Sequence, residues 1–399
     1  MINKNFTMQP FKFINKTRAI IFIFVAVASF IHVDTTRAFS TSISKKTSAE
    51  PYPHILKTQT FDLNTRNIKV LTSQGKHLWM GTGQGIIRYD THTNEDYKVY
   101  DNQNHLLSNG IFAISMDPEN RPWVGTYGGG LSHFDGKQWH HYNTPQGLND
   151  AFVYDIEFDK NSLWLATWSG VNRVTGDPGS RKNWQSFTFE NTEGGLIDDW
   201  VYAIEIEPSG KTWFGTESGI SAYHHGKWEA FNHSNGLGAP YDQVQQENRS
   251  IMSLFQGQHH SASPSIPNLQ TSDYRPNYVV SMLLDKKNRL WIGTWGGGLS
   301  MLDTHTSIFR NFTMKDGLPG NFILALELDR SGRLWIGTND GLSRFDGKTF
   351  QNFSAINGLK SKFIFSIEAT SDHSLWLGGN RSLTRMILDP ETGTPLKIN

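Results

Sequence analysis

One short pattern recurs seven times along this chain, and that recurrence constrains the fold more than any other feature of the sequence. In most copies a tryptophan is followed by an apolar residue and Gly-Thr, and then by a glycine and a further apolar residue. The tryptophans of the seven copies are Trp79, Trp123, Trp164, Trp213, Trp291, Trp335 and Trp376. Their successive spacings are 44, 41, 49, 78, 44 and 41 residues. A period in the mid-forties predicts a β-propeller with one blade per copy.

The residues around each tryptophan predict four short strands per copy. In the sixth copy, apolar stretches at 321–329, 334–338, 341–346 and 349–354 are separated by Asp, Gly and Asn turns. An Asn-Gly-Leu sequence at 357–359 then leads into the next copy. We therefore expect an all-β fold, a single seven-bladed propeller of four-stranded blades.

The repeated motif resembles the two-component regulator propeller repeats, over about residues 62–390. The resemblance implies an extracytoplasmic sensor module of the kind found in bacterial hybrid sensor proteins. No kinase, DNA-binding or nucleotide-cyclase motif follows the repeats. Only the sensing role is therefore expected of this chain, with any signal relayed through a separate membrane partner.

Composition excludes several classes of function. Lys plus Arg and Asp plus Glu both number 37, so the balanced charge offers no basic stripe for nucleic acid. The chain has no cysteine, which excludes disulfides, thiolate catalysis and thiolate metal sites. We expect no cofactor and no metal. The oligomeric state is left open.

The N-terminal part differs from the repeats. Residues 1–38 combine basic residues, the apolar run 19–31 and a polar stretch, which is typical of a cleaved export signal. The apolar run is shorter than the roughly 20 residues of a spanning helix, although an uncleaved anchor is the alternative. We expect a periplasmic or secreted protein, with a linker at 39–54 and the propeller at 55–399. Its outermost closing strand comes from 55–61, or alternatively from a C-terminal hairpin at 386–398.

A polar insertion at 238–276 accounts for the long gap between the fourth and fifth tryptophans. Strand directions place it on the same face of the ring as the turns that follow Gly-Thr. Loops that decorate one face of a rigid scaffold are where binding residues usually lie. We take this face as the candidate functional face.

The residue after Gly-Thr is the main candidate for ligand contact in each copy. Aromatic rings beside amides and carboxylates suit a sugar, which offers both C–H faces and hydroxyls. The alternative is that these rings seal the ends of the blades. The candidates at this position, where the first copy has Gly83, are Tyr127, Trp168, Glu217, Trp295, Asn339 and Asn380.

A second set of candidates lies on the innermost strands. Asp155 occupies a position where the other copies have small residues, so it contacts a ligand or ion, or else backbone amides and channel water. Asp199, Asn277 and Asn321 open their innermost strands, where they bind a polar ligand or cap the local turn. Glu157, Glu205, Glu327 and Glu368 recur at equivalent positions, which indicates a scaffold role.

No catalytic motif is present. The sequence has neither HExxH nor GxSxG, and the triple glycines at 128–130 and 296–298 join strands and are not followed by the GK[ST] of a phosphate loop. Histidine pairs occur at 140–141, 224–225 and 259–260 without metal-site spacing. The leading hypothesis is a sensor that binds a polar small molecule or oligosaccharide. The alternatives are a protein-interaction scaffold that uses 238–276, and a polysaccharide-active hydrolase or lyase with carboxylates from several blades.

Overall fold

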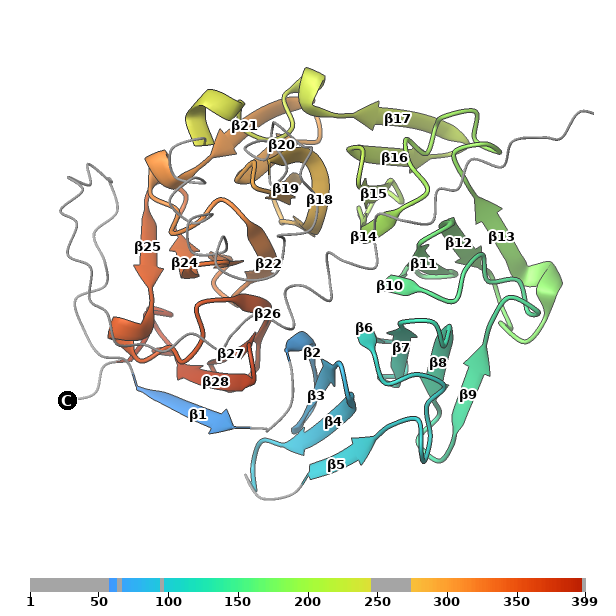
Figure 1. Ribbon diagram of the computed structural model, residues 1–399, viewed down its shortest axis with the longest axis horizontal. Helices are drawn as coiled ribbons and strands as arrows, with labels where there is room; N and C mark the ends of the chain where they lie inside the picture. The colour runs from blue at the N-terminus through green and yellow to red at the C-terminus, as the bar shows by residue number, and fades with distance from the viewer. Residues whose placement is uncertain (1–56, 63–66, 94–96, 245–273, 397–399) are drawn as a thin grey trace, which may run out of the picture. The chain divides into compact units, whose positions relative to one another are not determined.

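The computed structural model describes residues 57–62, 67–93, 97–244 and 274–396, and its strands form seven antiparallel four-stranded sheets arranged in a ring (Figure 1). Each sheet is one blade. The innermost strands, from the first blade to the seventh, are β2 (Ile68–Gln74), β6 (Ile111–Met116), β10 (Val153–Phe158), β14 (Val201–Ile206), β18 (Arg275–Leu284), β22 (Ile323–Leu328) and β26 (Ile364–Ala369).

The remaining strands complete the blades outward from the axis. The second strands are β3 (His77–Thr82), β7 (Pro122–Thr126), β11 (Leu163–Thr167), β15 (Thr212–Thr216), β19 (Arg289–Trp295), β23 (Leu334–Thr338) and β27 (Ser374–Gly379). The third strands are β4 (Gly85–Asp90), β8 (Leu131–Phe134), β12 (Gly170–Val174), β16 (Ile220–His224), β20 (Leu299–Asp303), β24 (Gly341–Phe345) and β28 (Ser382–Ile387). The outermost strands are β5 (Tyr97–Tyr100), β9 (Trp139–Tyr142), β13 (Trp184–Phe187), β17 (Lys227–Phe231), β21 (Ile308–Phe312), β25 (Phe350–Phe353) and, in the seventh blade, β1 (Thr58–Asp62). The predicted seven-bladed all-β propeller is confirmed.

The ring is closed by the N-terminal strand. β1 pairs with β28 from Thr58 opposite Met386 to Asp62 opposite Ser382, and β2 packs against both β6 and β26. The described C-terminal segment adds an isolated bridge between Leu388 and Pro395, and the carbonyl of Leu396 accepts the amide of Lys57 beside β1. The first and last blades are therefore held together by backbone hydrogen bonds between the two ends of the chain, as the N-terminal closure alternative expects.

The recurrent tryptophans fill the wedges between blades. All seven are buried, and each packs against the second strand of the following blade. Trp291, for example, shares a cluster with Leu334, Ile336 and Phe345 of the sixth blade. A fully buried tryptophan removes about 200 Å² from water, which stabilises the fold by roughly 5 kcal/mol. The predicted core role of these residues is confirmed.

Six of the seven tryptophans also donate a hydrogen bond to a side chain at or before the turn that precedes their strand. The Nε1 of Trp291 donates to Oδ2 of Asp285 at 3.0 Å, while Oδ1 of Asp285 accepts the amides of Lys287 and Arg289. One carboxylate thus fixes both the turn and the indole. Equivalent bonds join Trp79 to Gln74, Trp123 to Asp117, Trp164 to Asp159, Trp213 to Glu207 and Trp335 to Asp329. The Nε1 of Trp376 has no partner within the described part of the chain.

Threonine and glycine of the repeated motif shape the turn between the second and third strands. In the fifth blade, Oγ1 of Thr294 donates to the carbonyl of Gly298 at 2.8 Å. Gly298 has φ +79°, and a Cβ at this position would lie 2.3 Å from the carbonyl oxygen of Phe312. Only glycine satisfies both constraints, so the triple glycines serve the turn, as predicted.

The loops between blades contain a buried leucine. Three of them contain a short 3-10 helix, η2 (His233–Asn235), η3 (Met314–Asp316) or η4 (Ala355–Asn357), each ended by a left-handed glycine. The leucines that follow, Leu237, Leu318 and Leu359, are buried. A fourth 3-10 helix, η1 (Arg181–Asn183), precedes β13.

The turns after the second strands lie against these inter-blade loops. The amide of Gly298 donates to the carbonyl of Asn321, and the amide of Gly170 donates to that of Asp199. We name the face formed by these turns and loops the loop face, and the opposite one the turn face. β18 begins at Arg275, two residues earlier than the strand predicted from Asn277, because Arg275 pairs with Trp295 across a register shift. Residues 245–273 of the predicted insertion lie outside the described residues.

Trp335→Phe and Trp376→Phe form a matched pair that tests the turn anchor. Both indoles are fully buried beneath an arginine, but only Trp335 donates to a carboxylate. We expect Trp335→Phe to lower the free energy of unfolding by about 1.5–3 kcal/mol more than Trp376→Phe, measured by urea denaturation. Equal losses would show that the bond to Asp329 contributes nothing beyond packing.

Candidate functional site

The three aromatic candidates lie on the loop face, at the turns that follow β7, β11 and β19. Tyr127 is 39% exposed, and Trp168 and Trp295 are half-buried. The backbone holds each of them in place. The amides of Tyr127 and Trp168 donate to the carbonyls of Gly110 and Phe152, and Trp295 forms a β-bridge with Phe322.

These rings pack against aromatic residues at the start of the innermost strands, mostly edge to face. The ring of Phe152 lies between Tyr127 and Trp168, at centroid distances of 4.6 and 4.8 Å and near-perpendicular angles. Trp168 also meets Trp200, and Trp295 contacts both Tyr278 and Phe322. We name this set the aromatic arc: Tyr127, Phe152, Trp168, Trp200, Tyr278, Trp295 and Phe322. The edge-to-face partners fix the ring orientations and leave part of Tyr127, Trp168 and Trp295 open to solvent.

Sequence reasoning missed four of the seven residues of the aromatic arc. Phe152, Trp200, Tyr278 and Phe322 all occupy the residue immediately before the apolar start of the innermost strand. The recurrence of aromatic residues at this one position of the repeat was the signal in the sequence that could have identified them.

Glu217 is held by an arginine from the neighbouring blade. Its Oε1 lies 3.0 Å from Nη1 of Arg275, the residue that opens β18. Burial raises the pKa of Glu217 despite the opposing charge of Arg275. Arg275 was counted with the insertion from sequence, because the extra strand residues that place it beside Trp295 leave no trace in the repeat pattern.

The two asparagine candidates have different surroundings. Asn339 is buried, and its Oδ1 has no hydrogen-bond partner among the described residues. Asn380 is half-buried, and its amide donates to Oγ of Ser361 at 3.1 Å. Neither side chain joins the aromatic arc.

The candidates that open the innermost strands hold the loops in shape. Oδ1 of Asp199 accepts the amide of Phe189 at 2.6 Å, and Asn277 and Asn321 accept the amides of His233 and Met314 in the same way. In all three blades, the side chain accepts the backbone amide of the second residue after the end of the preceding outermost strand. These contacts fit the second alternative for these residues, in which they cap the local turn.

Asp155 joins two blades through backbone amides. Its Oδ1 accepts the amide of Ile156 at 2.9 Å, and its Oδ2 accepts that of Ile204, on the next blade, at 2.7 Å. Burial raises the pKa of Asp155 to about 6. These are the backbone-amide contacts that were one of its two predicted alternatives.

Three of the four recurrent glutamates of the innermost strands form similar links to the following blade. Glu368 accepts the amide of Ser73 across the ring closure at 3.0 Å. Glu205 and Glu327 accept the amides of Leu284 and Ala369 on the following blades. Burial raises the pKa of Glu205 to about 8 and also raises those of Glu157, Glu327 and Glu368. These links fit the predicted scaffold role.

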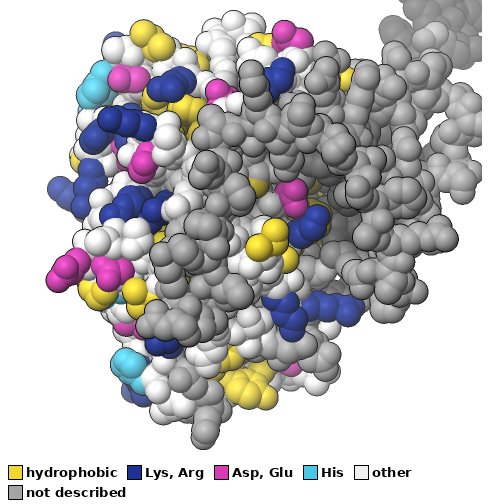
Figure 2. All heavy atoms as spheres, turned by 90° about the vertical axis from the view of Figure 1, so that its left-hand side faces the viewer, with side chains coloured by type: hydrophobic (Ala, Val, Ile, Leu, Met, Phe, Trp, Pro, Cys, Tyr) yellow, Lys and Arg dark blue, Asp and Glu magenta, His cyan; other side chains and the backbone are white. Residues whose placement is uncertain are grey.

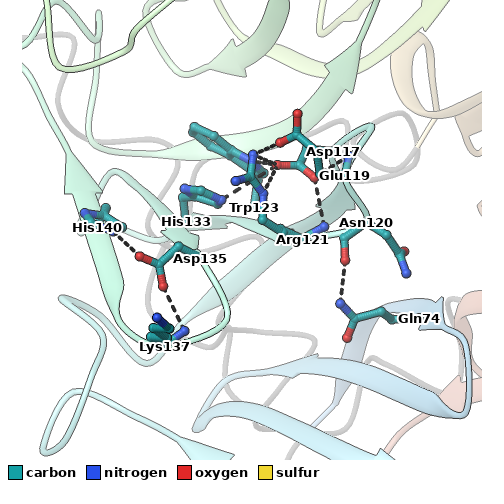
Figure 3. A network of polar contacts seen from close by, with 10 residues as sticks. All are labelled: Gln74, Asp117, Glu119, Asn120, Arg121, Trp123, His133, Asp135, Lys137 and His140. Atoms are coloured by element: carbon teal, nitrogen blue, oxygen red, sulfur yellow. Dashed lines mark hydrogen bonds and ion pairs between the residues drawn. The ribbon is translucent and has the colours of Figure 1, made fainter.

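The turn face carries a polar network centred on Asp117. Figure 3 shows Asp117 accepting from Arg121 and Trp123, with His133 beside it. The ring of His133 stacks on Trp123 at 4.3 Å, and burial lowers the pKa of this imidazole. These interactions replace the arginine that covers the tryptophan in several other blades.

The first histidine pair lies in the outer strand β9, and the second lies at the turn face. His140 bonds Asp135 at 2.8 Å, and His224 and His225 lie at the turn after β16 (Figure 3 shows the first contact). Residues 259–260 lie outside the described residues.

Further features bear on metal, membrane and nucleic-acid binding. Within the described ranges, no group of three or more His, Asp or Glu side chains could hold a metal ion. Over the same residues, no helix combines the length and apolarity needed to cross a bilayer, and the 19–31 run lies outside them. On the side of the molecule in Figure 2, basic and acidic side chains are interspersed.

The family comparison agrees with the blade geometry. The model of the two-component regulator propeller matches residues 273–296 and 317–340, which span the first two strands of the fifth and sixth blades. These two stretches are two-component regulator propeller repeats. No curated protein sequence matches it.

Solved structures share the fold of these repeats. The chain is similar to the extracellular domain of BT3049 from B. thetaiotaomicron, described as a hybrid two-component system, with 20% identity and a TM-score of 0.65 over 84% of this chain. It is also similar to the extracellular domain of BT4673 from the same organism, with 18% identity and a TM-score of 0.60 over 85% of this chain. The chain spans 41% and 40% of these two domains. YCF48 bound to a D1 peptide matches at 18% identity and a TM-score of 0.57, over 86% of this chain and 98% of its own.

Glu205→Gln tests whether the buried acids control stability. The pKa of Glu205 is about 8 in the folded protein, above its ordinary value of 4.5. Protonated Glu205 therefore contributes fully to the free energy of unfolding below pH 4.5, and this contribution is lost as pH rises toward 8. We expect the substitution to reduce that loss by up to about 1.4 kcal/mol per pH unit. Urea denaturation between pH 5 and pH 8 measures the slope. The exposed Glu391→Gln is the control, and an identical slope in both variants would contradict the account.

Proposed function

We propose that this protein is an extracytoplasmic sensor propeller that binds a polar small molecule or oligosaccharide on its loop face. The observation that carries the proposal is the aromatic arc. Trp168 and Trp295 are held edge to face by their neighbours and keep part of their rings open to solvent. Rigid aromatic faces bind the C–H face of a sugar without a large loss of side-chain entropy.

Polar groups beside the aromatic arc would give the site its selectivity. The ion pair of Glu217 and Arg275 lies at the junction of blades four and five, and Arg275 is paired in register with Trp295. A carboxylate accepts from sugar hydroxyls, and a guanidinium donates to them. The pair therefore supplies both kinds of partner next to one exposed ring.

The same proposal covers location and signalling. The apolar run at 19–31 would direct export, the matched repeats are those of the two-component regulator propeller, and the two similar structures from B. thetaiotaomicron are extracellular domains. The occupied propeller would pass its signal to a membrane protein. Among the described residues, the carboxylates of the innermost strands do not favour a catalytic role. Asp155 and Glu368 accept hydrogen bonds from backbone amides of the neighbouring blade.

A protein-interaction scaffold is the second candidate. The loop face exposes three apolar side chains on inter-blade loops, Leu107, Phe189 and Ile356, and a neighbour of similar fold is named for its complex with a peptide. A partner captured through these loops would be lost in the Phe189→Ala and Ile356→Ala variants, whereas glycan binding would be retained.

Trp168→Ala and Trp295→Ala test the sugar-binding role. A glycan array identifies a binder, and isothermal titration calorimetry measures its affinity for each variant. We expect each substitution to weaken binding about tenfold or more, because each removes roughly 1.4 kcal/mol or more of stacking.

The control is Tyr97→Ala, which removes an exposed aromatic ring from the outer strand β5. This variant should bind as the unmodified protein does. Equal affinities in all three variants would reject the aromatic arc as the binding surface.

A further inference from the structure

Every innermost strand carries a β-bulge at the same place. The pairing with the second strand skips one residue in each blade, for example between Val153 and Asp155 in β10. The skipped residues are Lys69, Phe112, Tyr154, Tyr202, Val280, Leu324 and Phe365. We name this set the collar. All seven are half-buried, although the residue before each of them is almost completely buried.

Collar side chains from consecutive blades touch one another. Phe112 and Tyr154 lie 4.8 Å apart between ring centroids, and Tyr154 and Tyr202 lie 5.0 Å apart. The Nζ of Lys69 lies 4.1 Å from the centroid of Phe112. Four blades thus contribute to one continuous surface around the axis, which the innermost strands encircle in Figure 1.

The collar adjoins the aromatic arc. Phe112 contacts Tyr127 at 5.6 Å, and Tyr202 contacts Tyr278 at 4.9 Å. A ligand seated on Tyr127 or Trp295 therefore has the collar as its nearest inner neighbour.

The collar contains six uncharged residues and one ammonium group. The Lys69 side chain is half-buried, and this burial lowers the pKa of its ammonium group to about 8. A cation that is partly desolvated by burial gains more from an anionic partner than a fully hydrated one does.

We propose that the collar is the inner end of the ligand site and that Lys69 binds the carboxylate of an acidic sugar. This inference rests on the proposed function. The aromatic arc stacks on the sugar ring, and the ammonium of Lys69 selects for the charged substituent. Neutral sugars make the stacking contacts and lack the ion pair.

Two probes that differ at one carbon test this selectivity. 4-Nitrophenyl β-D-glucuronide carries a carboxylate where 4-nitrophenyl β-D-glucoside carries a hydroxymethyl group. We expect the unmodified protein to bind the glucuronide at least tenfold more tightly in calorimetry at pH 7. The preference should decline as pH rises through 8, because Lys69 then loses its proton.

Lys69→Met should remove the preference for the glucuronide over the glucoside, whereas Lys69→Arg should retain it. Lys98→Met is the matched control, because Lys98 lies 5.0 Å from the ring of Tyr100 on the outer strand β5. This control should keep the full preference.

A second readout uses the unmodified protein and does not depend on variant folding. Reductive methylation of lysines, followed by mass spectrometry, should show that the glucuronide protects Lys69 and not Lys98. Equal affinity for the two probes, or no protection of Lys69, would overturn the inference and leave sugar binding by the aromatic arc intact. Failure of both probes to bind would overturn it too, and the glycan array would then decide the proposed function separately.

Discussion

The structure depends on the tryptophan that fills the wedge between one blade and the next. Seven sheets splay outward from an axis, and the space between them widens with distance from it. A large indole closes that space, and roughly 5 kcal/mol of apolar burial per tryptophan outweighs the 1.5–3 kcal/mol of its hydrogen bond. The bond ties the indole of Trp291 to the carboxylate of Asp285, which also orders the preceding turn. Packing supplies the energy, and the carboxylate sets the orientation.

Repetition explains why the fold could be predicted from sequence. Wedge tryptophans, turn threonines and turn glycines each occur in most blades, so several weak signals agree on one architecture. The turns and the inter-blade loops also share one face, as expected, since Gly298 and Gly170 donate to the carbonyls of Asn321 and Asp199 in those loops. Strand directions alone determine this arrangement.

The candidate site was predicted only in part, because its determinants are departures from the repeat. Tyr127, Trp168 and Trp295 could be recognised by reading one position around the ring. Phe152 and Tyr278 could not be recognised from that position, since they belong to a different one. The ion pair between Glu217 and Arg275 depends on two extra strand residues, and the collar depends on a bulge. Such register shifts depend on how the strands pair in the folded protein, and no particular residue type in the sequence marks them.

The two faces of the ring differ in how much of their aromatic and polar surface is left open to a ligand. Groups on the turn face, such as Asp117 and Asp135, are engaged with neighbouring residues of the protein. The loop face presents aromatic rings that are fixed yet partly open. Hydrogen–deuterium exchange with and without a bound oligosaccharide tests this division most directly. The account predicts slowed exchange in peptides that cover 127–131, 168–170, 217–219 and 295–298, with no change at the turns 117–121 and 285–289. Protection confined to the turn face would contradict it.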